Sequence, residues 1–282
     1  MGLLQRVGLV FARKWVGGTT VEEAVKEAHR LNREGEKVIF NYLGEDLTDI
    51  SKVEKNTGVY ISLLEKIGRE KAKANIAVKP TQLGLCISYK SFISNYEGIV
   101  KAASKHGIFV WLDMEDHQYI NDTLTAYLAT LKKYKNIGIC IQSKLRRSYS
   151  DIKRLVPNGA VVRLVKGAYK NHGNLTFNSK EEVDKNYKKC MHYLFSHSKY
   201  FMIATHDDKL INQAIEFQSK FNSKMVFGML KGIRPKLALQ LVKEHHDVYI
   251  YVPFGEDWME YSLRRLKEKE HSMLILRSIF QG

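Results

Sequence analysis

The sequence predicts an α/β protein whose body is a closed (βα)8 barrel of TIM-barrel type. Short β-branched runs alternate with longer amphipathic runs along the 282-residue chain, and this alternation repeats eight times. In addition, polar residues follow most of the predicted strands. An open doubly wound sheet is the second choice, but no GxGxxG and no phosphate-binding lysine motif follows any strand.

The first predicted element is a helix within TTVEEAVKEAHRLNREG, where Thr20 suits the N-cap and Glu23 would complete a capping box. The eight predicted strands are KVIFNYL from Lys37, NIAVKPTQLGL from Asn75, GIFVWLDMED from Gly107, IGICIQSKL from Ile137, AVVRLVKGAY from Ala160, YFMIATHDD from Tyr200, KMVFGMLKG from Lys224 and VYIYVPFGED from Val248. Stretches of helical period lie between them, such as SFISNYEGIVKAASK and PKLALQLVKEHH. We therefore expect an N-terminal helical extension at 1–36 and a barrel at 37–282.

Composition is that of an ordinary globular protein, with 44% hydrophobic and 27% charged residues. The chain has neither an apolar run of roughly 18 to 20 residues nor a signal-peptide pattern, so a cytoplasmic location is expected. Cys86, Cys140 and Cys190 are widely spaced and odd in number, which predicts reduced core thiols. The ten histidines form no HExxH or similar spacing, and no metal site is predicted.

The formal charge of +15 raises the question of nucleic-acid binding. Lysines are spread along the whole chain and alternate with glutamates, as in KEEVDKNYKKC, and no aromatic-basic platform is present. A solvated basic surface without a nucleic-acid partner is therefore the favoured interpretation, and attraction to anionic membrane surfaces is a milder alternative.

Polar residues gather at the predicted strand ends, where active sites of (βα)8 barrels lie. Taken singly, each of them could be a helix cap, a satisfied core polar group or half of an ion pair. Together they predict a polar pocket that holds both charges. The residues are Lys79, Thr81, Gln82, Asp113, Glu115, Gln142, Arg163, Lys166, Tyr169, Thr205, His206, Asp207 and Tyr251.

A polar stripe near the C-terminus points to the same pocket. In MEYSLRRLKEKE, the residues at helical spacing i, i+3, i+4 and i+7 from Tyr261 are Arg264, Arg265 and Glu268. That spacing normally marks the buried apolar face of a helix. We expect the two arginines to converge on the pocket.

Several blocks of the sequence resemble the signature motifs of proline dehydrogenases. These blocks are VKPTQLGL, WLDMED, RLVKGAYK, IATHDD and YVPFGEDWMEYSLRRLKE, and they occur in the family's order from about Phe11 to the C-terminus. The resemblance implies a (βα)8 barrel with a displaced eighth helix. It also implies FAD-dependent oxidation of L-proline to Δ1-pyrroline-5-carboxylate by hydride transfer to flavin N5, the first step of proline catabolism.

The resemblance implies roles for the substrate-binding residues. Arg264 and Arg265 would hold the proline carboxylate with help from Lys79, because guanidinium groups form charge-assisted hydrogen bonds of fixed geometry. Glu268 would orient the arginines near the substrate amine. Tyr251 would close over the proline ring, and Asp113 would brace Tyr251.

The cofactor contacts are implied in the same way. Arg163 would lie by flavin N5 and Gln142 at the flavin ring, with Lys166 and Glu115 as an ion pair beside the cofactor. Gly167 and Ala168 would let the backbone approach closely, and Thr205 and His206 would line the ribityl and adenosine part.

This sequence departs from the family pattern after two strands. VFGMLKG replaces EFQ(M/L)LYG, which places Val226, Gly228 and Lys231 at the motif positions. QSKLRRS replaces a QAYLYRT-like stretch, with Arg147 matching its final arginine. We expect weaker FAD affinity or tolerance of FMN.

The expected partners are L-proline and a quinone or other electron acceptor, and a homo-oligomer is also considered. The N-terminal stretch 1–18 carries Leu3, Leu4, Val7, Val10 and Phe11 on one side. It is expected to pack on the barrel or on a neighbouring subunit, with peripheral contact at the inner face of the cell membrane as the weaker hypothesis. Two other functions stay open: a basic nucleic-acid-binding barrel, and a barrel enzyme for another carboxylate substrate.

Overall fold

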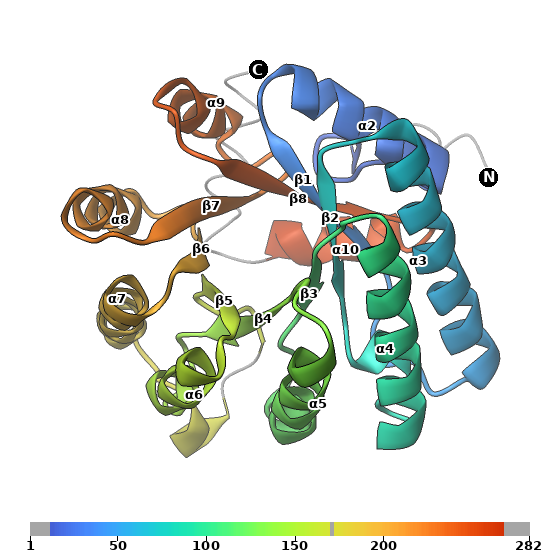
Figure 1. Ribbon diagram of the computed structural model, residues 1–282, viewed down its shortest axis with the longest axis horizontal. Helices are drawn as coiled ribbons and strands as arrows, with labels where there is room; N and C mark the ends of the chain where they lie inside the picture. Colours follow the sequence, from blue (N-terminus) through green and yellow to red (C-terminus); the bar gives the residue numbers. More distant parts are fainter. Residues whose placement is uncertain (1–11, 170–171, 268–282) are drawn as a thin grey trace.

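Eight parallel strands close into a barrel in the computed structural model, which describes residues 12–169 and 172–267, with side chains as far as residue 263 (Figure 1). The strand order around the barrel follows the chain, and β1 pairs with β8 to close it. The predicted (βα)8 fold is confirmed. The strands are β1 (Lys37–Tyr42), β2 (Ala74–Val78), β3 (Val110–Leu112), β4 (Ile137–Gln142), β5 (Val161–Val165), β6 (Tyr200–Ala204), β7 (Lys224–Leu230) and β8 (Val248–Phe254).

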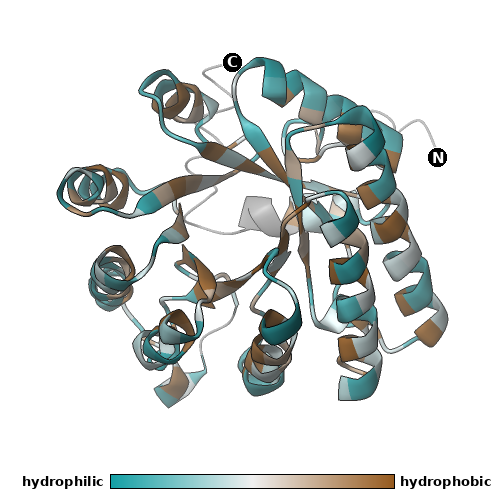
Figure 2. Cartoon of the chain, in the orientation of Figure 1, coloured by the Kyte–Doolittle hydropathy of each residue, from teal (hydrophilic) through white to brown (hydrophobic). Residues whose placement is uncertain are grey.

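A ring of helices surrounds the barrel, because each of the first seven strands is followed by a helix on the outside (Figure 1). Hydrophobic residues run through the strands and recur along the surrounding helices (Figure 2). These residues form the main core between sheet and helices. The ring consists of α3 (Ile50–Glu70), α4 (Tyr89–Lys105), α5 (Ile120–Lys133), α6 (Ser148–Leu155), α7 (Lys180–His197), α8 (Asp208–Lys220) and α9 (Pro235–Lys243).

Helix α2 (Val21–Arg33) precedes the barrel and contacts β1, α3 and β8. Thr20 is its N-cap, and the Thr20 side chain accepts a hydrogen bond from the Glu23 N–H, as predicted. A capping box requires the Glu23 carboxylate to accept from the N–H of the N-cap, Thr20. It accepts instead from the N–H of the preceding residue, Thr19, at 2.7 Å. A full capping box forms instead at α7, between Ser179 and Glu182.

The inside of the barrel is filled by a second, smaller apolar cluster that includes Trp111, Met202 and Val226. Trp111 is fully buried, and a Cβ on Gly138 would lie 2.5 Å from its ring. Gly138 is therefore required for the indole to fit on the barrel axis side of β3 and β4. The packed interior restricts polar chemistry to the strand ends.

Helix α10 (Trp258–Lys267), which follows β8, is not part of this ring and is drawn near the centre of Figure 1. Trp258 packs with Leu43, which follows β1. Tyr261 packs against the cluster of Trp15 and Ile233, as does Leu230 at the end of β7. The helix therefore lies over the carboxyl ends of the strands, and the predicted displacement is confirmed.

The N-terminal stretch supports this helix. Ala12 and Val16 share a buried cluster with Trp258, and Trp15 packs with Ile233. This part of the stretch therefore packs on the barrel, as expected. The apolar residues predicted to share one side, Leu3, Leu4, Val7, Val10 and Phe11, lie outside the described residues.

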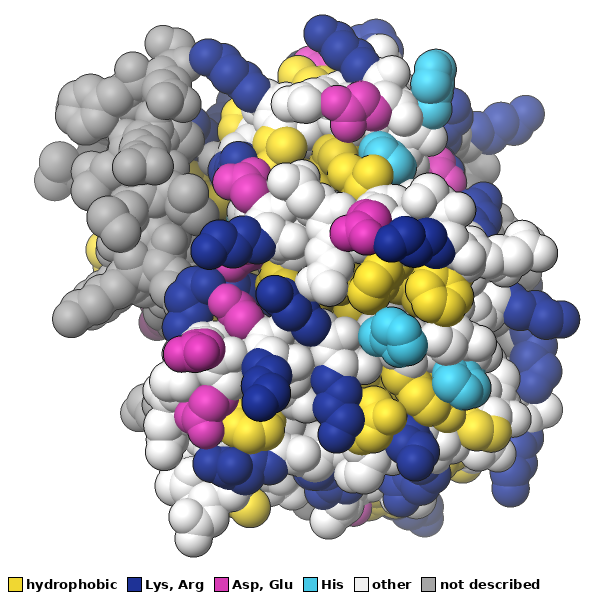
Figure 3. Space-filling model, turned by 90° about the vertical axis from the view of Figure 1, so that its left-hand side faces the viewer, with side chains coloured by type: hydrophobic (Ala, Val, Ile, Leu, Met, Phe, Trp, Pro, Cys, Tyr) yellow, Lys and Arg dark blue, Asp and Glu magenta, His cyan; other side chains and the backbone are white. Residues whose placement is uncertain are grey.

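The surface carries charges of both signs. Figure 3 shows one face on which Lys and Arg side chains alternate with acidic and hydrophobic ones. Across the described residues, no helix combines the length and the apolar character needed to cross a bilayer. Cys140 and Cys190 are buried free thiols, whereas Cys86 is only half-buried, next to the Tyr119 hydroxyl at 3.3 Å.

Candidate active site

The centre of the candidate site is formed by Asp113, which directly follows β3, by Arg163 within β5 and by Tyr251 within β8. Arg163 is 5% exposed and Asp113 is 6% exposed. The Arg163 Nη2 donates to Asp113 Oδ1, and the Tyr251 hydroxyl donates to Asp113 Oδ2 at 2.7 Å. One carboxylate thus fixes both a guanidinium and a phenol, which agrees with the bracing contact expected for Asp113.

Electrostatic interactions keep the Arg163 guanidinium charged and the Tyr251 phenol neutral. Burial disfavours the charged guanidinium, but Asp113, Cys140 and Tyr251 together outweigh it and raise the pKa of Arg163. Burial and the Asp113 charge also raise the pKa of Tyr251 well above its usual range. Tyr251 therefore remains a neutral hydrogen-bond donor, and its ring lies 5.4 Å from the guanidinium.

Lys79 lies beside this centre, just after β2. Its ammonium donates to the Tyr169 hydroxyl at 3.3 Å and lies 3.5 Å from the Glu45 carboxylate. Burial opposes the charge, yet Tyr169, Glu115 and other acidic groups together raise the pKa of Lys79 well above its usual value. The site therefore holds a second permanent cation next to Arg163.

Glu115 and Lys166 do not form the ion pair that the resemblance implied. Glu115 is buried and accepts from the N–H and the hydroxyl of Thr81, at 2.8 and 2.7 Å. Lys166 instead lies 2.7 Å from Asp184 on α7 and 2.9 Å from Asp207, the N-cap of α8. The implied pair does not form, because Glu115 is hydrogen-bonded to Thr81 and Lys166 is paired with Asp184 and Asp207.

The loop after β5 approaches Gln142 closely. Gly167 has φ of 112°, and a Cβ there would lie 2.7 Å from Gln142 Oε1, so only glycine fits. The Gln142 amide donates to the carbonyls of Met114 and Glu115, at 3.0 and 2.9 Å. Ala168 is exposed. Gly167 thus lies against the Gln142 side chain, and its approach to a cofactor stays a prediction.

Thr205 and His206, at the end of β6, bond to neighbouring backbone. The Thr205 hydroxyl accepts from the Asp207 N–H at 3.2 Å, and His206 Nε2 accepts from the Leu230 N–H at 3.1 Å. These contacts hold the ends of β6 and β7 together.

The departures after β7 have structural explanations. A Cβ on Gly228 would lie 2.8 Å from the Met202 sulfur, so Gly228 faces the interior packing of β6. The Lys231 ammonium donates to the carbonyls of Arg13 and Lys14 and lies 3.3 Å from Glu27. Lys231 thus anchors the N-terminal stretch.

The backbone of Arg264 and Arg265 belongs to α10, which lies over the strand ends, whereas Glu268 lies outside the described residues. The structure therefore brings the helix that carries the two arginines to the same end of the barrel as Lys79 and Tyr251.

The Arg163 guanidinium has hydrogen-bond donors that a bound flavin could satisfy. Its Nε and Nη1 are buried and have no hydrogen-bond partner among the described residues. Buried donors normally have acceptors, so these two point to an acceptor supplied by a bound group. A flavin ring offers nitrogen and carbonyl acceptors of the kind that these two donors need. The residues present fit the cofactor.

Two features of the site were not predicted. Glu45, in the loop after β1, pairs with Lys79. Asp116, His117 and His172 bring ligand-type atoms within 4.8 Å of one another, although no metal spacing exists in the sequence. Glu45 follows a strand and could have been found by the strand-end rule, whereas His172 is too distant in sequence from the other two.

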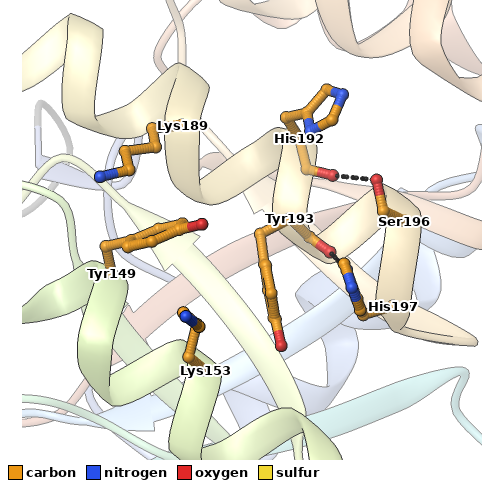
Figure 4. A pocket seen from close by; sticks show the side chains of 7 residues that line it. All are labelled: Tyr149, Lys153, Lys189, His192, Tyr193, Ser196 and His197. Carbon is orange, nitrogen blue, oxygen red and sulfur yellow. Dashed lines mark hydrogen bonds between the residues drawn. The ribbon is translucent and has the colours of Figure 1, made fainter.

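A hollow of about 570 Å³ lies elsewhere, on the outer side between α6 and α7 (Figure 4). Lys189 stacks over the Tyr149 ring at 4.0 Å, and Tyr193 stacks on His197. None of the predicted site residues lines this hollow. Its lining residues are Tyr149, Lys153, Lys189, His192, Tyr193, Ser196 and His197.

Comparison with known proteins gives matches over most of the chain. The family model described as Proline dehydrogenase matches residues 24–274. Proline dehydrogenase 2 of Bacillus subtilis (strain 168) is 35% identical over 263 residues, which cover 92% of this chain and 87% of that protein. Proline dehydrogenase of Deinococcus radiodurans is 28% identical over 280 residues, covering 96% of this chain and 90% of that one.

The solved structure of proline utilization A from Bdellovibrio bacteriovorus, inactivated by N-propargylglycine, is similar with a TM-score of 0.88 and 22% identity. The match covers 96% of this chain and 34% of that longer chain, so this chain spans about a third of the solved protein. At this identity the likeness shows a shared fold.

Proposed function

Since this chain belongs to the proline dehydrogenase family, we propose that it converts L-proline to Δ1-pyrroline-5-carboxylate with a bound FAD. Membership of the family supports the oxidation of proline. The single observation that supports this most is the buried Arg163, which Asp113 holds in place with two N–H groups available for an acceptor. This arrangement is what a barrel that binds a flavin at its strand ends requires.

Cofactor binding would depend on residues that lie in or after β4, β5 and β6. Arg163 would donate to the flavin ring, Gln142 would lie at its edge, and Gly167 and Ala168 would give backbone access. When bound, the flavin would accept the hydride, which carries both electrons that leave proline. Thr205 and His206 lie at the end of β6, where they would line the rest of the cofactor.

The substrate carboxylate would be held by cations on two sides. Lys79 supplies one, since its raised pKa keeps it charged at neutral pH. Arg264 and Arg265 of α10 would supply the others, and Glu268 would orient them. Two planar guanidiniums on adjacent positions fix the orientation of a carboxylate as well as its position.

Tyr251 would set the position of the proline ring. Its hydroxyl is committed to Asp113, so its ring has a fixed orientation toward the site. Fixing the ring aligns the carbon that loses hydride with the acceptor, which accounts for much of the rate advantage in such reactions. In the balanced reaction, a hydride leaves the ring carbon, a proton leaves the neutral amine for solvent, and a C=N bond forms.

A quinone is the proposed acceptor for the electrons after each turnover, by family resemblance. The high net charge would favour approach to an anionic membrane, where quinones reside. A barrel enzyme for another carboxylate is the second candidate function, because an arginine pair would bind other carboxylates equally well.

The decisive experiment follows the visible spectrum of the purified protein anaerobically during addition of L-proline. We expect a flavin spectrum that bleaches with L-proline and much less with L-hydroxyproline, and mass analysis of the released cofactor distinguishes FAD from FMN. Arg264→Ala should retain the flavin but need far more proline, whereas Arg33→Ala, on the exposed side of α2, should behave as the parent. A flavin that stays oxidised with proline and bleaches with another amino acid would support the second candidate.

A further inference from the structure

Three side chains at the rim of the barrel mouth form a compact group that the proposed reaction does not use. Asp116 and His117 follow β3, and His172 lies in the loop after β5. Asp116 Oδ1 lies 2.5 Å from His117 Nδ1, and Asp116 Oδ2 lies 2.9 Å from His172 Nε2. The two imidazole rings are 4.0 Å apart.

The chemistry of this group is that of a metal ligand set. Two imidazole nitrogens and one carboxylate oxygen are ligands that zinc commonly takes, at about 2.0–2.2 Å. One ligand atom from each of the three residues lies within 4.8 Å of the other two. A cation between them would need only small outward shifts of the side chains, and a fourth position would stay open for water.

The three side chains are also accessible to a cation from solvent. The three side chains are 36%, 29% and 25% exposed for His117, His172 and Asp116, so a hydrated cation can reach them. The imidazoles favour zinc and its neighbours over Mg²⁺ and Ca²⁺, which prefer oxygen ligands.

We propose that Asp116, His117 and His172 bind a divalent transition-metal cation of the zinc class, which clamps the loop after β3 to the loop after β5. The second loop carries Gly167 and Tyr169, and Tyr169 contacts Lys79 through its hydroxyl. Metal occupancy would therefore restrain a loop that lies between the cofactor side and the substrate side of the barrel mouth.

Zinc binding tests the proposal directly. Protein without a histidine tag is dialysed to equilibrium against micromolar Zn²⁺ with excess Mg²⁺, and bound zinc is measured by elemental analysis. We expect one Zn²⁺ per chain. His117→Ala, His172→Ala and Asp116→Asn should each weaken binding at least tenfold, since even outer-shell changes cost about 10–100-fold in known sites.

Two controls accompany these variants. His29→Ala removes an exposed imidazole that also pairs with one carboxylate, that of Glu70, but has no second histidine. Cys86→Ser removes the half-buried thiol. Both should bind zinc as the parent does, and far-ultraviolet circular dichroism verifies that every variant is folded.

Thermal denaturation gives a second readout. Zinc should raise the melting temperature of the parent and of both controls, and this rise should be lost in the three site variants. Unchanged stoichiometry and affinity in folded His117→Ala and Asp116→Asn proteins would overturn the proposal, leaving a hydrogen-bonded trio without an ion. Neither readout requires flavin or proline turnover, so the result is independent of the proposed enzymatic function.

Discussion

Removal of the Asp113 carboxylate tests the centre of the site most directly. In Asp113→Ala, the Arg163 guanidinium loses the one carboxylate that pairs with it among the described residues, while remaining in a position where it is 5% exposed. The Tyr251 hydroxyl loses its acceptor at the same time. The substitution therefore leaves a buried cation and a donor without an acceptor.

The size of the effect follows from the unpaired charge. Breaking a buried ion pair by removing one partner costs about 3–5 kcal/mol. The Tyr251 hydroxyl also loses its acceptor, but the two costs are not additive because both involve the same carboxylate. We therefore expect the free energy of unfolding of Asp113→Ala to be about 4 kcal/mol lower than that of the parent. At about 2–4 °C per kcal/mol for a domain of this size, the melting temperature should fall by roughly 8–16 °C.

A double-mutant cycle in urea, followed by circular dichroism, separates the charge from the packing. Arg163→Met removes the cation, so the double variant should recover about 2 kcal/mol or more relative to Asp113→Ala. Asp184→Ala, which removes one partner of the more exposed Lys166, is the matched control and should cost less than about 1 kcal/mol. A cost below about 1 kcal/mol for Asp113→Ala, or a double variant less stable than Asp113→Ala, would refute the reasoning.

Four further predictions concern other parts of the chain. Tyr251→Phe should keep the fold and narrow the difference in kcat/KM between proline and hydroxyproline; identical kinetics for both substrates would contradict the positioning role. Gly167→Ala, with its Cβ 2.7 Å from Gln142 Oε1, should lose about 1–2 kcal/mol of stability and bind less flavin per chain, and full flavin content would oppose it. Burial and then Glu34 raise the pKa of Glu36 from 4.5 to about 7, so its protonated form contributes stability below pH 4.5 that is lost as pH rises through about 7. Glu36→Gln should therefore be up to about 3 kcal/mol more stable than the parent near pH 8 and no more stable near pH 4, as measured by urea unfolding at both values. Arg265→Lys should raise KM for proline more than it lowers kcat, because an ammonium cannot reproduce the planar fork, and steady-state kinetics with an unchanged KM would count against that contact.

The strands were predictable because a parallel barrel buries both faces of each strand, which leaves continuous β-branched runs. The run from Gly107 shows the limit of this signal. The structure forms β3 from only Val110–Leu112, and the Asp113 N–H that follows still donates to the Val78 carbonyl of β2 at 2.9 Å. The apolar run begins at Ile108, two residues before the strand, so hydrophobicity does not mark where β3 begins.

The site was predictable to the level of which strand ends contribute, because all carboxyl ends of a parallel barrel meet at one end. Pairings between side chains were not predictable in the same way. Lys166 extends to Asp184 and Asp207 instead of Glu115, and this depends on the path of each loop after its strand. The meeting of His172 with Asp116 has the same origin, since it joins two loops distant in sequence.

The support of α10 by the N-terminal stretch has a practical consequence for protein engineering. Ala12 and Val16 pack under Trp258, and Lys231 holds the carbonyls of Arg13 and Lys14. Residues 12–16 therefore support α10, the helix that carries Arg264 and Arg265. A fusion partner or immobilising linker attached close to residue 12 would therefore disturb the packing of α10. A flexible spacer at that point should leave the position of α10 unchanged.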